Sequence, residues 1–207
     1  MGAGGNVYNE SFQLTFLERE AVRQRVSKVM TVLERIARTR PDARVLELGC
    51  GFRGTNLTFI KRRFPEMQCF GMDLRVDGAS TEGIDLFEAD LNRWQPEDQW
   101  DFVFSLAVVE HLPDPGAHFR LIRDCLCHGG QSVLTTPTPL SFPVLMALSA
   151  LRIFDARTIL DHKFYLTREG IEFFARNTGL SVVHLSSFQW GMNQYAVLQR
   201  PMEGLSV

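Results

Sequence analysis

The sequence predicts an α/β fold built around a mostly parallel sheet, and three observations lead to this prediction. Short apolar segments of strand length alternate with helical segments from residue 44 to residue 136. A turn that contains three glycines follows the first apolar segment. The next two apolar segments run into acidic residues. Short buried strands that alternate with helices are typical of a parallel sheet that helices cover on both faces.

Length and composition indicate one ordinary globular domain over residues 1–207. Of these 207 residues, 45% are hydrophobic and 22% charged, which suffices for a core of normal size. A net charge of -2 gives no basic footprint, so we expect no nucleic acid partner. Four cysteines are too few for a disulfide scaffold, and neither a leader segment nor an integral membrane segment is visible. A cytoplasmic protein is therefore expected.

Each element is predicted from its local pattern. Apolar residues at helical spacing indicate a helix from about Phe12 to Arg38, which forms an N-terminal helical cap over residues 1–40. The predicted strands are 44–48, 67–72, 84–88, 102–106, 131–136, 180–190 and 193–198. The predicted helices between them are 55–64, 115–127 and 167–178. Gly191-Met192 joins the last two strands, which predicts a hairpin at the edge of the sheet.

The glycine turn, residues 49–54, is the first candidate site. Glycine lets a ligand approach bare backbone, because it has no Cβ and tolerates φ > 0. The helix that follows presents free N–H groups and a partial positive charge at its N-terminus. The same spacing also fits a dinucleotide-binding turn, so the glycines alone do not choose between ligands.

Three acidic residues mark one edge of the predicted sheet. Glu47 lies at the end of the first strand, Asp73 at the end of the second and Asp90 just after the third. The carboxyl ends of parallel strands share an edge, where open α/β sheets bind ligands. A carboxylate accepts hydrogen bonds, so Asp73 suits ribose hydroxyls and Asp90 an adenine amine. Each residue alone could be an ordinary polar strand end, but the three in order predict a nucleoside site.

Four segments together resemble a known family. They are Glu47-Leu48-Gly49-Cys50-Gly51, Gly71-Met72-Asp73, Glu88-Ala89-Asp90-Leu91, and the strand from Trp100-Asp101 with its exit Val109-Glu110-His111-Leu112-Pro113. This combination is similar to the class I S-adenosylmethionine-dependent methyltransferases. It most resembles the branch that includes ubiquinone-biosynthesis O-methyltransferases and many small-molecule or glycan methyltransferases. The resemblance implies a Rossmann-like sheet of seven strands, with an antiparallel last strand and helices on both faces.

The resemblance also implies S-adenosylmethionine as the cofactor. Within the implied site, Glu47 and the glycines hold the methionine part, Asp73 the ribose, and Asp90 with Leu91 the adenine. Leu106 forms a wall where the fourth strand ends. The full set of predicted cofactor-binding residues is Glu47, Gly49, Cys50, Gly51, Asp73, Leu74, Asp90, Leu91 and Leu106.

Two positions depart from the family pattern. Phe52 and Arg53 both stand before Gly54, where the usual pattern has a single residue. The extra residue either directs Arg53 to the mouth of the pocket or leaves it as a solvated loop residue. Some quinone-pathway members carry an acid three residues before the Glu-His pair, which supports a divalent cation. That position here is Ala107, so no metal is expected.

Two histidines are candidates for a catalytic base. Methyl transfer from a sulfonium depends mostly on orientation, and a hydroxyl acceptor also benefits from a base of near-neutral pKa. His111 follows the fourth strand, and His162 precedes the last helix. Both also have a structural interpretation. His111 could shape the turn into the helix at Pro115, and His162 could be a solvated residue or one that fixes a lid.

Residues 137–163 fit neither a strand nor a helix pattern and are predicted to form a lid. Residues 142–154 are almost wholly apolar, but the stretch is too short to span a bilayer. Four interpretations remain open for it: a core helix, a homodimer contact, the wall of an acceptor pocket, or a shallow membrane-surface helix.

The sequence as a whole predicts methyl transfer from S-adenosylmethionine to a small molecule or glycan, at oxygen. Val109-Glu110-His111 stands where enzymes that methylate amino groups of bases carry an Asn-Pro-Pro-Tyr type loop. One alternative is a nicotinamide-dependent oxidoreductase, which Glu47 and Asp90 disfavour. The other is a non-catalytic protein that binds the cofactor without turnover, which the departures at residues 52, 53 and 107 keep open.

Overall fold

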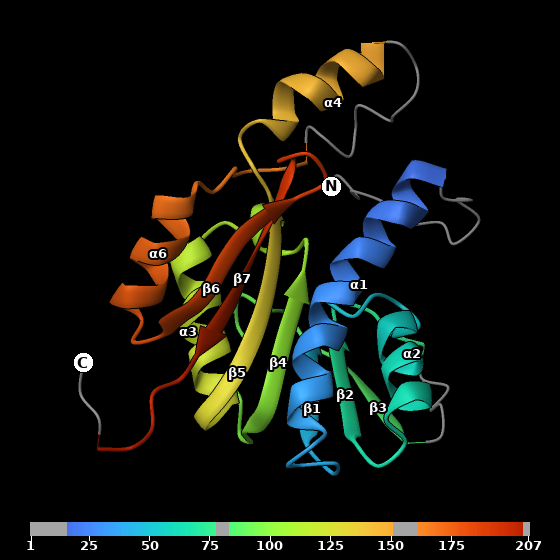
Figure 1. The fold of residues 1–207 in the computed structure, drawn as a ribbon, viewed down its shortest axis with the longest axis vertical. Helices are drawn as coiled ribbons and strands as arrows, with labels where there is room; N and C mark the ends of the chain where they lie inside the picture. The colour runs from blue at the N-terminus through green and yellow to red at the C-terminus, as the bar shows by residue number, and fades with distance from the viewer. Residues whose placement is uncertain (1–15, 78–82, 151–160, 205–207) are drawn as a thin grey trace, which may run out of the picture.

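The computed structural model describes residues 16–77, 83–150 and 161–204, and it confirms the predicted α/β fold class (Figure 1). Within these residues, seven strands form one sheet in the order β3-β2-β1-β4-β5-β7-β6. The strands are β1 (Arg44–Leu48), β2 (Gln68–Asp73), β3 (Ile84–Glu88), β4 (Trp100–Leu106), β5 (Leu126–Pro137), β6 (Ser181–Phe188) and β7 (Asn193–Gln199). The helices are α1 (Phe16–Ile36), α2 (Thr55–Arg63), α3 (Pro115–Cys125), α4 (Ser141–Ala150) and α6 (Arg168–Asn177), with a 3-10 turn η1 (Val109–His111).

The strand order reverses between β1 and β4, which pair in parallel with each other. β7 runs antiparallel to both β5 and β6, so the predicted antiparallel last strand and the edge hairpin are confirmed. The carboxyl ends of the five parallel strands therefore lie along one edge. In open sheets of this kind, ligands bind at that edge where the strand order reverses.

Two hydrophobic cores lie on opposite faces of the sheet, and β1 contributes to both. Val45 belongs to the core under α1 and α2, whereas Leu46 and Leu48 belong to the core under α3 and α6. Side chains alternate between the faces of a strand, which explains this division. Helices consequently cover both faces, as predicted, while α4 stands beyond the carboxyl ends of β4 and β5 (Figure 1).

The predicted helix over 115–127 is wrong at its end. α3 stops at Cys125, and Leu126 is already extended, with φ -82° and ψ 138°. The next residues join β5, because Gly129 N donates to Arg200 O and Arg200 N donates to Gly130 O. Pairing with the chain beyond β7 thus supplies backbone partners that a further helical turn lacks. The two glycines lie inside the strand, where the β4–β5 register shifts, rather than at the end of the helix.

Other boundaries follow local geometry. β6 ends at Phe188, two residues before the predicted end, because Gln189 and Trp190 adopt positive φ angles of 52° and 53° in the turn to β7. Part of the predicted lid forms α4, and residues 151–160 lie outside the described residues. The predicted start of the first helix, residues 12–15, also lies outside them.

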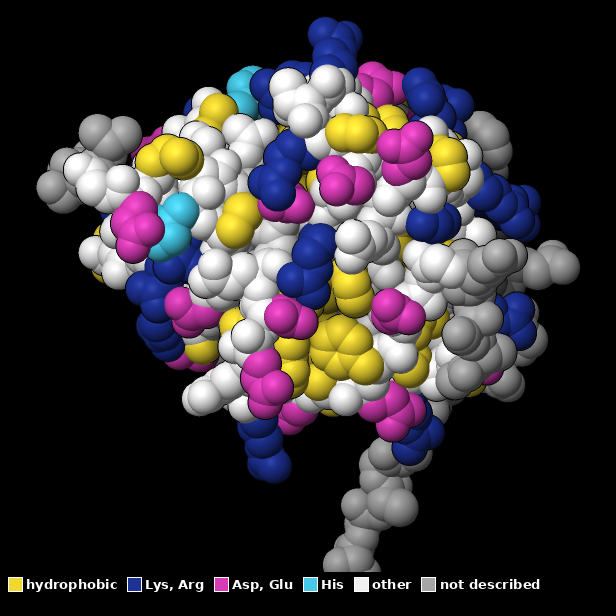
Figure 2. Space-filling view, turned by 90° about the horizontal axis from the view of Figure 1, so that it is seen from below, with side chains coloured by type: hydrophobic (Ala, Val, Ile, Leu, Met, Phe, Trp, Pro, Cys, Tyr) yellow, Lys and Arg dark blue, Asp and Glu magenta, His cyan; other side chains and the backbone are white. Residues whose placement is uncertain are grey.

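Surface charge and helix composition also bear on the predicted partners. On the face at the amino ends of the parallel strands, basic and acidic side chains are interspersed, without a continuous basic stripe (Figure 2). None of the helices in the described part of the chain is long and apolar enough to cross a membrane.

Candidate functional site

The glycine turn is fixed to the end of β2 by hydrogen bonds. The backbone N–H groups of Gly49 and Cys50 donate to Met72 O at 2.9 and 3.0 Å. Gly51 N donates to Asp73 Oδ2 at 2.8 Å, and Leu74 N donates to Asp73 Oδ1 at 2.7 Å. Asp73 therefore anchors the turn, and its remaining lone pairs can accept hydrogen bonds from a ligand.

Glycine is required at two positions of the turn for different reasons. At Gly49, with φ +80°, an added Cβ would lie 2.6 Å from Val108 Cγ2, so only glycine lets the turn approach the segment after β4. At Gly51 the reason is the backbone angle, φ +70°, which residues with a Cβ rarely adopt. An added Cβ there would meet nothing within 4 Å. The space beside Gly51 is therefore open to a ligand.

Glu47 lies buried at the base of this turn, with 1% of its surface exposed. Asn56 Nδ2 donates to Glu47 Oε1 at 2.7 Å, but Glu47 Oε2 has no hydrogen-bond partner. Burial raises the pKa of Glu47 to about 8. A buried carboxylate oxygen without a partner is costly unless a donor reaches it. The ammonium group in the methionine part of S-adenosylmethionine is such a donor, so this site fits the predicted cofactor.

The ends of β2 and β3 meet as predicted, since Ala89 N donates to Asp73 O at 2.9 Å. Asp90 Oδ1 accepts from Asn92 N at 2.9 Å and from Asn92 Nδ2 at 2.8 Å, and these bonds lower the pKa of Asp90. Leu91 is half-buried behind this loop. The three predicted acids thus lie in order along the carboxyl edge, each at its own strand end.

The remaining predicted cofactor residues differ in exposure. Leu106 is half-buried at the end of β4, and Leu74 is 62% exposed. The Cys50 thiol packs in the core beneath the turn, where burial raises its pKa to about 12. Phe52 and Arg53 are exposed on the turn, and Gly54, which follows them, starts α2 in a left-handed conformation.

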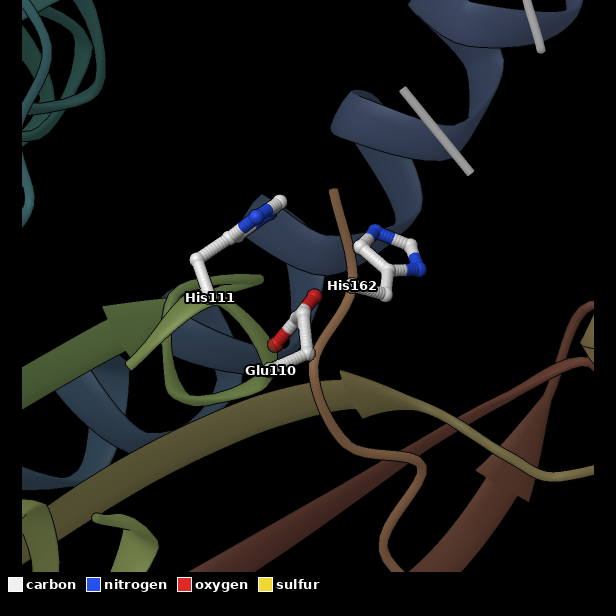
Figure 3. Close-up of side chains that lie close together, drawn as sticks. All are labelled: Glu110, His111 and His162. Atoms are coloured by element: carbon white, nitrogen blue, oxygen red, sulfur yellow. The ribbon is translucent and has the colours of Figure 1, made fainter. Parts of the chain in front are cut away.

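The structure brings the two candidate histidines together from distant parts of the chain. Residues 161–166 run beside η1, because Lys163 N donates to Glu110 O at 2.8 Å and Lys163 Nζ donates to His111 O at 2.7 Å. The ring centroids of His111 and His162 are consequently 4.9 Å apart, at an interplanar angle of 69°. Figure 3 shows Glu110 beside the two rings.

The partners of the two histidines differ. His111 Nδ1 lies 3.0 Å from Asp161 Oδ2. A carboxylate only accepts, so His111 Nδ1 donates and its Nε2 keeps a lone pair. His162 Nδ1 lies 3.1 Å from the hydroxyl of Tyr165, and burial lowers the pKa of His162 to about 4. Of the two rings, His111 is the one that has a carboxylate partner.

Glu110 is buried between these groups, with 1% of its surface exposed. Its Oε2 accepts from Thr136 Oγ1 at 3.2 Å, its Oε1 has no partner, and burial raises its pKa. Potential metal-ligating atoms of Glu110, His111 and His162 all lie within 4.8 Å of one another. Imidazole and carboxylate groups are also ligands of divalent metals, so the expectation of no metal stays a prediction.

Sequence reasoning missed the residues that support this site. Asp161 and Glu110 are direct neighbours of the predicted histidines, but no sequence pattern indicates a hydrogen bond across 50 residues. Asn56 is the second residue of α2, where its side chain reaches Glu47. Arg25 had a detectable signal, because it falls on the apolar stripe of the first helix, between Val22 and Val29.

Comparisons with known proteins identify the family of this chain. A family model described as a methyltransferase domain matches residues 20–185. Trans-aconitate 2-methyltransferase from Rhizobium rhizogenes is 30% identical over 125 residues, which cover 58% of this chain and 48% of that protein. Ubiquinone biosynthesis O-methyltransferase from Pseudomonas syringae pv. tomato is 28% identical over 152 residues, covering 67% of this chain and 65% of that protein. The chain therefore spans about half the length of the first relative and about two thirds of the second.

Solved structures share the fold. Magnesium protoporphyrin IX methyltransferase from Synechocystis PCC 6803, with bound S-adenosylhomocysteine, superposes with a TM-score of 0.68 at 17% identity, over 91% of this chain and 89% of that one. The Rossmann-like sheet with an antiparallel last strand is thereby confirmed. The family match confirms the predicted family and its cofactor, S-adenosylmethionine, over the nicotinamide alternative. This chain belongs to the class I S-adenosylmethionine-dependent methyltransferases.

Proposed function

We propose that this chain transfers a methyl group from S-adenosylmethionine to an oxygen atom of a small-molecule acceptor, with His111 as the catalytic base. The supporting observation is the His111–Asp161 pair, which leaves the lone pair of His111 Nε2 free at the exit of β4. Val108, three residues before His111, touches the glycine turn at Gly49. A base at His111 therefore lies one short turn of chain from the proposed cofactor cradle.

In this proposal, three carboxylates position the cofactor. Glu47 Oε2 binds the ammonium group, Asp73 binds the ribose hydroxyls and Asp90 binds the adenine amine, while Leu91 and Leu106 supply apolar contact. When bound, S-adenosylmethionine supplies a methyl group on a positively charged sulfur, which becomes a neutral thioether as the methyl passes to the acceptor oxygen. Most of the rate enhancement then comes from holding these groups in line.

His111 performs the proton transfer. As the acceptor hydroxyl oxygen takes up the methyl, its proton passes to His111 Nε2, and Asp161 stabilises the resulting imidazolium through Nδ1. His162, whose pKa burial lowers to about 4, stays neutral and shapes the acceptor side. The net result is a methyl ether, S-adenosylhomocysteine and one proton that His111 later releases to water.

The lid interpretation is refined by one contact. Phe142 at the start of α4 meets Tyr165 edge-on, with ring centroids 5.6 Å apart, and Tyr165 in turn bonds His162. This chain of contacts favours α4 as an apolar wall of the acceptor pocket over the other interpretations. A small molecule with a hydroxyl group and an apolar body fits this wall better than a glycan does.

Two measurements test the proposal. Calorimetric titration of the purified protein with S-adenosylmethionine, S-adenosylhomocysteine and NAD should show binding of the two sulfur compounds alone. Release of S-adenosylhomocysteine with a panel of hydroxylated aromatic acids and quinols should then be stimulated by acceptor, and His111→Ala should abolish the stimulation. Cofactor binding without stimulation by any acceptor would support the non-catalytic alternative.

A further inference from the structure

The guanidinium of Arg25 on α1 is poorly satisfied. Its Nε is buried and has no hydrogen-bond partner. Its Nη2 donates one long bond, 3.4 Å, to Asn193 Oδ1 at the start of β7. Arg123 shows what the same edge of a guanidinium does when an anion is present, because its Nε and Nη2 donate to Asp124 Oδ1 at 2.9 and 2.6 Å. Arg25 therefore has the donors for a carboxylate, but no carboxylate of the described residues accepts a hydrogen bond from it.

Arg25 faces the histidine site. Its charge acts on Glu110 and on His162: it favours the ionised form of Glu110, and it adds to the burial that lowers the pKa of His162. Glu110 does not satisfy the hydrogen-bond donors of Arg25, since Glu110 Oε1 and Arg25 Nε both lack a hydrogen-bond partner. Thr136, which bonds Glu110, pairs across β5 and β7 with Gln194, next to Asn193. The unpaired atoms thus lie in one region of the fold, at the carboxyl ends of β4 and β5 and the amino end of β7.

A purely structural role explains Arg25 poorly. Its position on the apolar stripe of α1 suits a valine or leucine, as at the buried Val29 and Leu33. Burying an unpaired charge there is unfavourable, and a weak bond to an amide oxygen compensates only a small part of the lost hydration. Within the described residues, Glu110 acts on Arg25 through its charge but makes no hydrogen bond to it, so the buried Nε points to a carboxylate that comes from outside.

We propose that Arg25 binds a carboxylate group of the methyl acceptor and so makes the site selective for small anionic acceptors. This rests on the proposed function, because it places the acceptor beside His111. A guanidinium binds a carboxylate through two parallel N–H···O bonds, which fixes orientation as well as position. The carboxylate held by Arg25 would thereby set which end of the acceptor reaches the base.

The test compares matched probes on the protein saturated with S-adenosylhomocysteine. Protocatechuate and protocatechuamide share a catechol but differ in charge, and trans-aconitate supplies a different anionic skeleton. Calorimetry should show binding of the two carboxylates, with the amide at least about tenfold weaker. Arg25→Gln should weaken the carboxylates by about tenfold to a hundredfold without changing the amide. Arg23→Gln, which removes an exposed arginine on the same helix, should change neither.

Several outcomes would overturn the inference. Equal affinity for the acid and its amide, or no binding of either carboxylate at millimolar concentration while S-adenosylhomocysteine binds, would contradict it. An equal loss of affinity for all three probes in Arg25→Gln would also contradict the inference. Loss of carboxylate binding on addition of EDTA would mean that a cation at Glu110, His111 and His162 holds the anion. If Arg25→Gln does not fold, Arg25→Lys keeps the charge but loses the fork, and intermediate carboxylate affinity is expected.

The same measurements distinguish failure of this inference from failure of the proposed function. If S-adenosylhomocysteine itself does not bind, the methyl-transfer proposal fails first. If it binds and the native protein does not discriminate acid from amide, only the role of Arg25 fails.

Discussion

His111 Nδ1 and Asp161 Oδ2 lie 3.0 Å apart although 50 positions separate the two residues in the sequence. This contact depends on the segment 161–166, which bonds to the backbone of η1. It fixes the tautomer of His111, because a carboxylate only accepts and His111 Nδ1 therefore donates.

We expect Asp161→Asn to lower kcat about ten- to a hundredfold, since an amide can turn its NH2 toward Nδ1 and favour the wrong tautomer. The affinity for S-adenosylmethionine should stay unchanged, because Asp161 does not touch the glycine turn. Steady-state kinetics and calorimetry check the two quantities, with the exposed Asp98→Asn as control. Equal loss of cofactor affinity would show that Asp161 holds the fold of the site and does not act through His111.

Asp73 should determine cofactor affinity. Asp73→Asn keeps the size but loses an acceptor that holds Gly51 N at 2.8 Å and is proposed to bind ribose hydroxyls. Binding of S-adenosylmethionine should weaken at least about tenfold, since hydrogen bonds to a charged group contribute about 1.5–3 kcal/mol. Calorimetry measures this, and the exposed Asp85→Asn on β3 serves as control. Unchanged affinity in Asp73→Asn would refute the assignment of the nucleoside site.

Alanine substitutions at Gly49 and Gly51 distinguish the cost of backbone strain from the cost of steric overlap. Both have positive φ, so an alanine at either position should cost about 1–2 kcal/mol of unfolding free energy. At Gly49 the new Cβ also meets Val108 at 2.6 Å, which should add about 1–3 kcal/mol. Urea unfolding of the two variants without cofactor tests this order.

Val108→Ala should restore part of the stability lost in Gly49→Ala and none of that lost in Gly51→Ala. An equal loss of unfolding free energy in Gly49→Ala and Gly51→Ala would mean that Val108 moves aside and accommodates the added methyl.

Glu47 should make the stability of the protein depend on pH. Its pKa is raised from 4.5 to about 8 by burial. Between these values the unfolded chain loses the proton that the folded protein keeps, so the unfolding free energy falls as pH rises from about 5 to about 8, by up to about 1.4 kcal/mol per pH unit from this group. Glu47→Gln should remove this slope, as measured by urea unfolding across that range.

Other buried groups also titrate, so the difference between native protein and Glu47→Gln is the relevant quantity. The exposed Glu66→Gln should leave the slope unchanged. Saturation with S-adenosylmethionine should also flatten it in the native protein, because a bound ammonium favours ionised Glu47. An identical slope in native protein and Glu47→Gln would contradict the raised pKa.

The sequence by itself determined the sheet and the order of the acidic residues along its edge. Val45 and Leu48 are buried in any parallel sheet, and Glu47, Asp73 and Asp90 follow strands whose carboxyl ends must share an edge. Both features depend on local patterns and on the handedness of crossovers, so they can be recognised from spacing alone. The end of α3 could not be predicted from spacing. The two glycines, Gly129 and Gly130, read locally as a helix stop, but their backbone pairs with Arg200 and belongs to the strand.

The tertiary structure alone decided how the histidine site is assembled. Sequence patterns identified His111 and His162 separately, but whether either acquires a partner depends on how residues 161–166 lie against η1. Likewise, a single arginine on an apolar stripe becomes informative only when its Nε is found buried, without a partner, beside Glu110. Contacts between segments far apart in the chain are set by the packing of the whole domain, which no local pattern encodes.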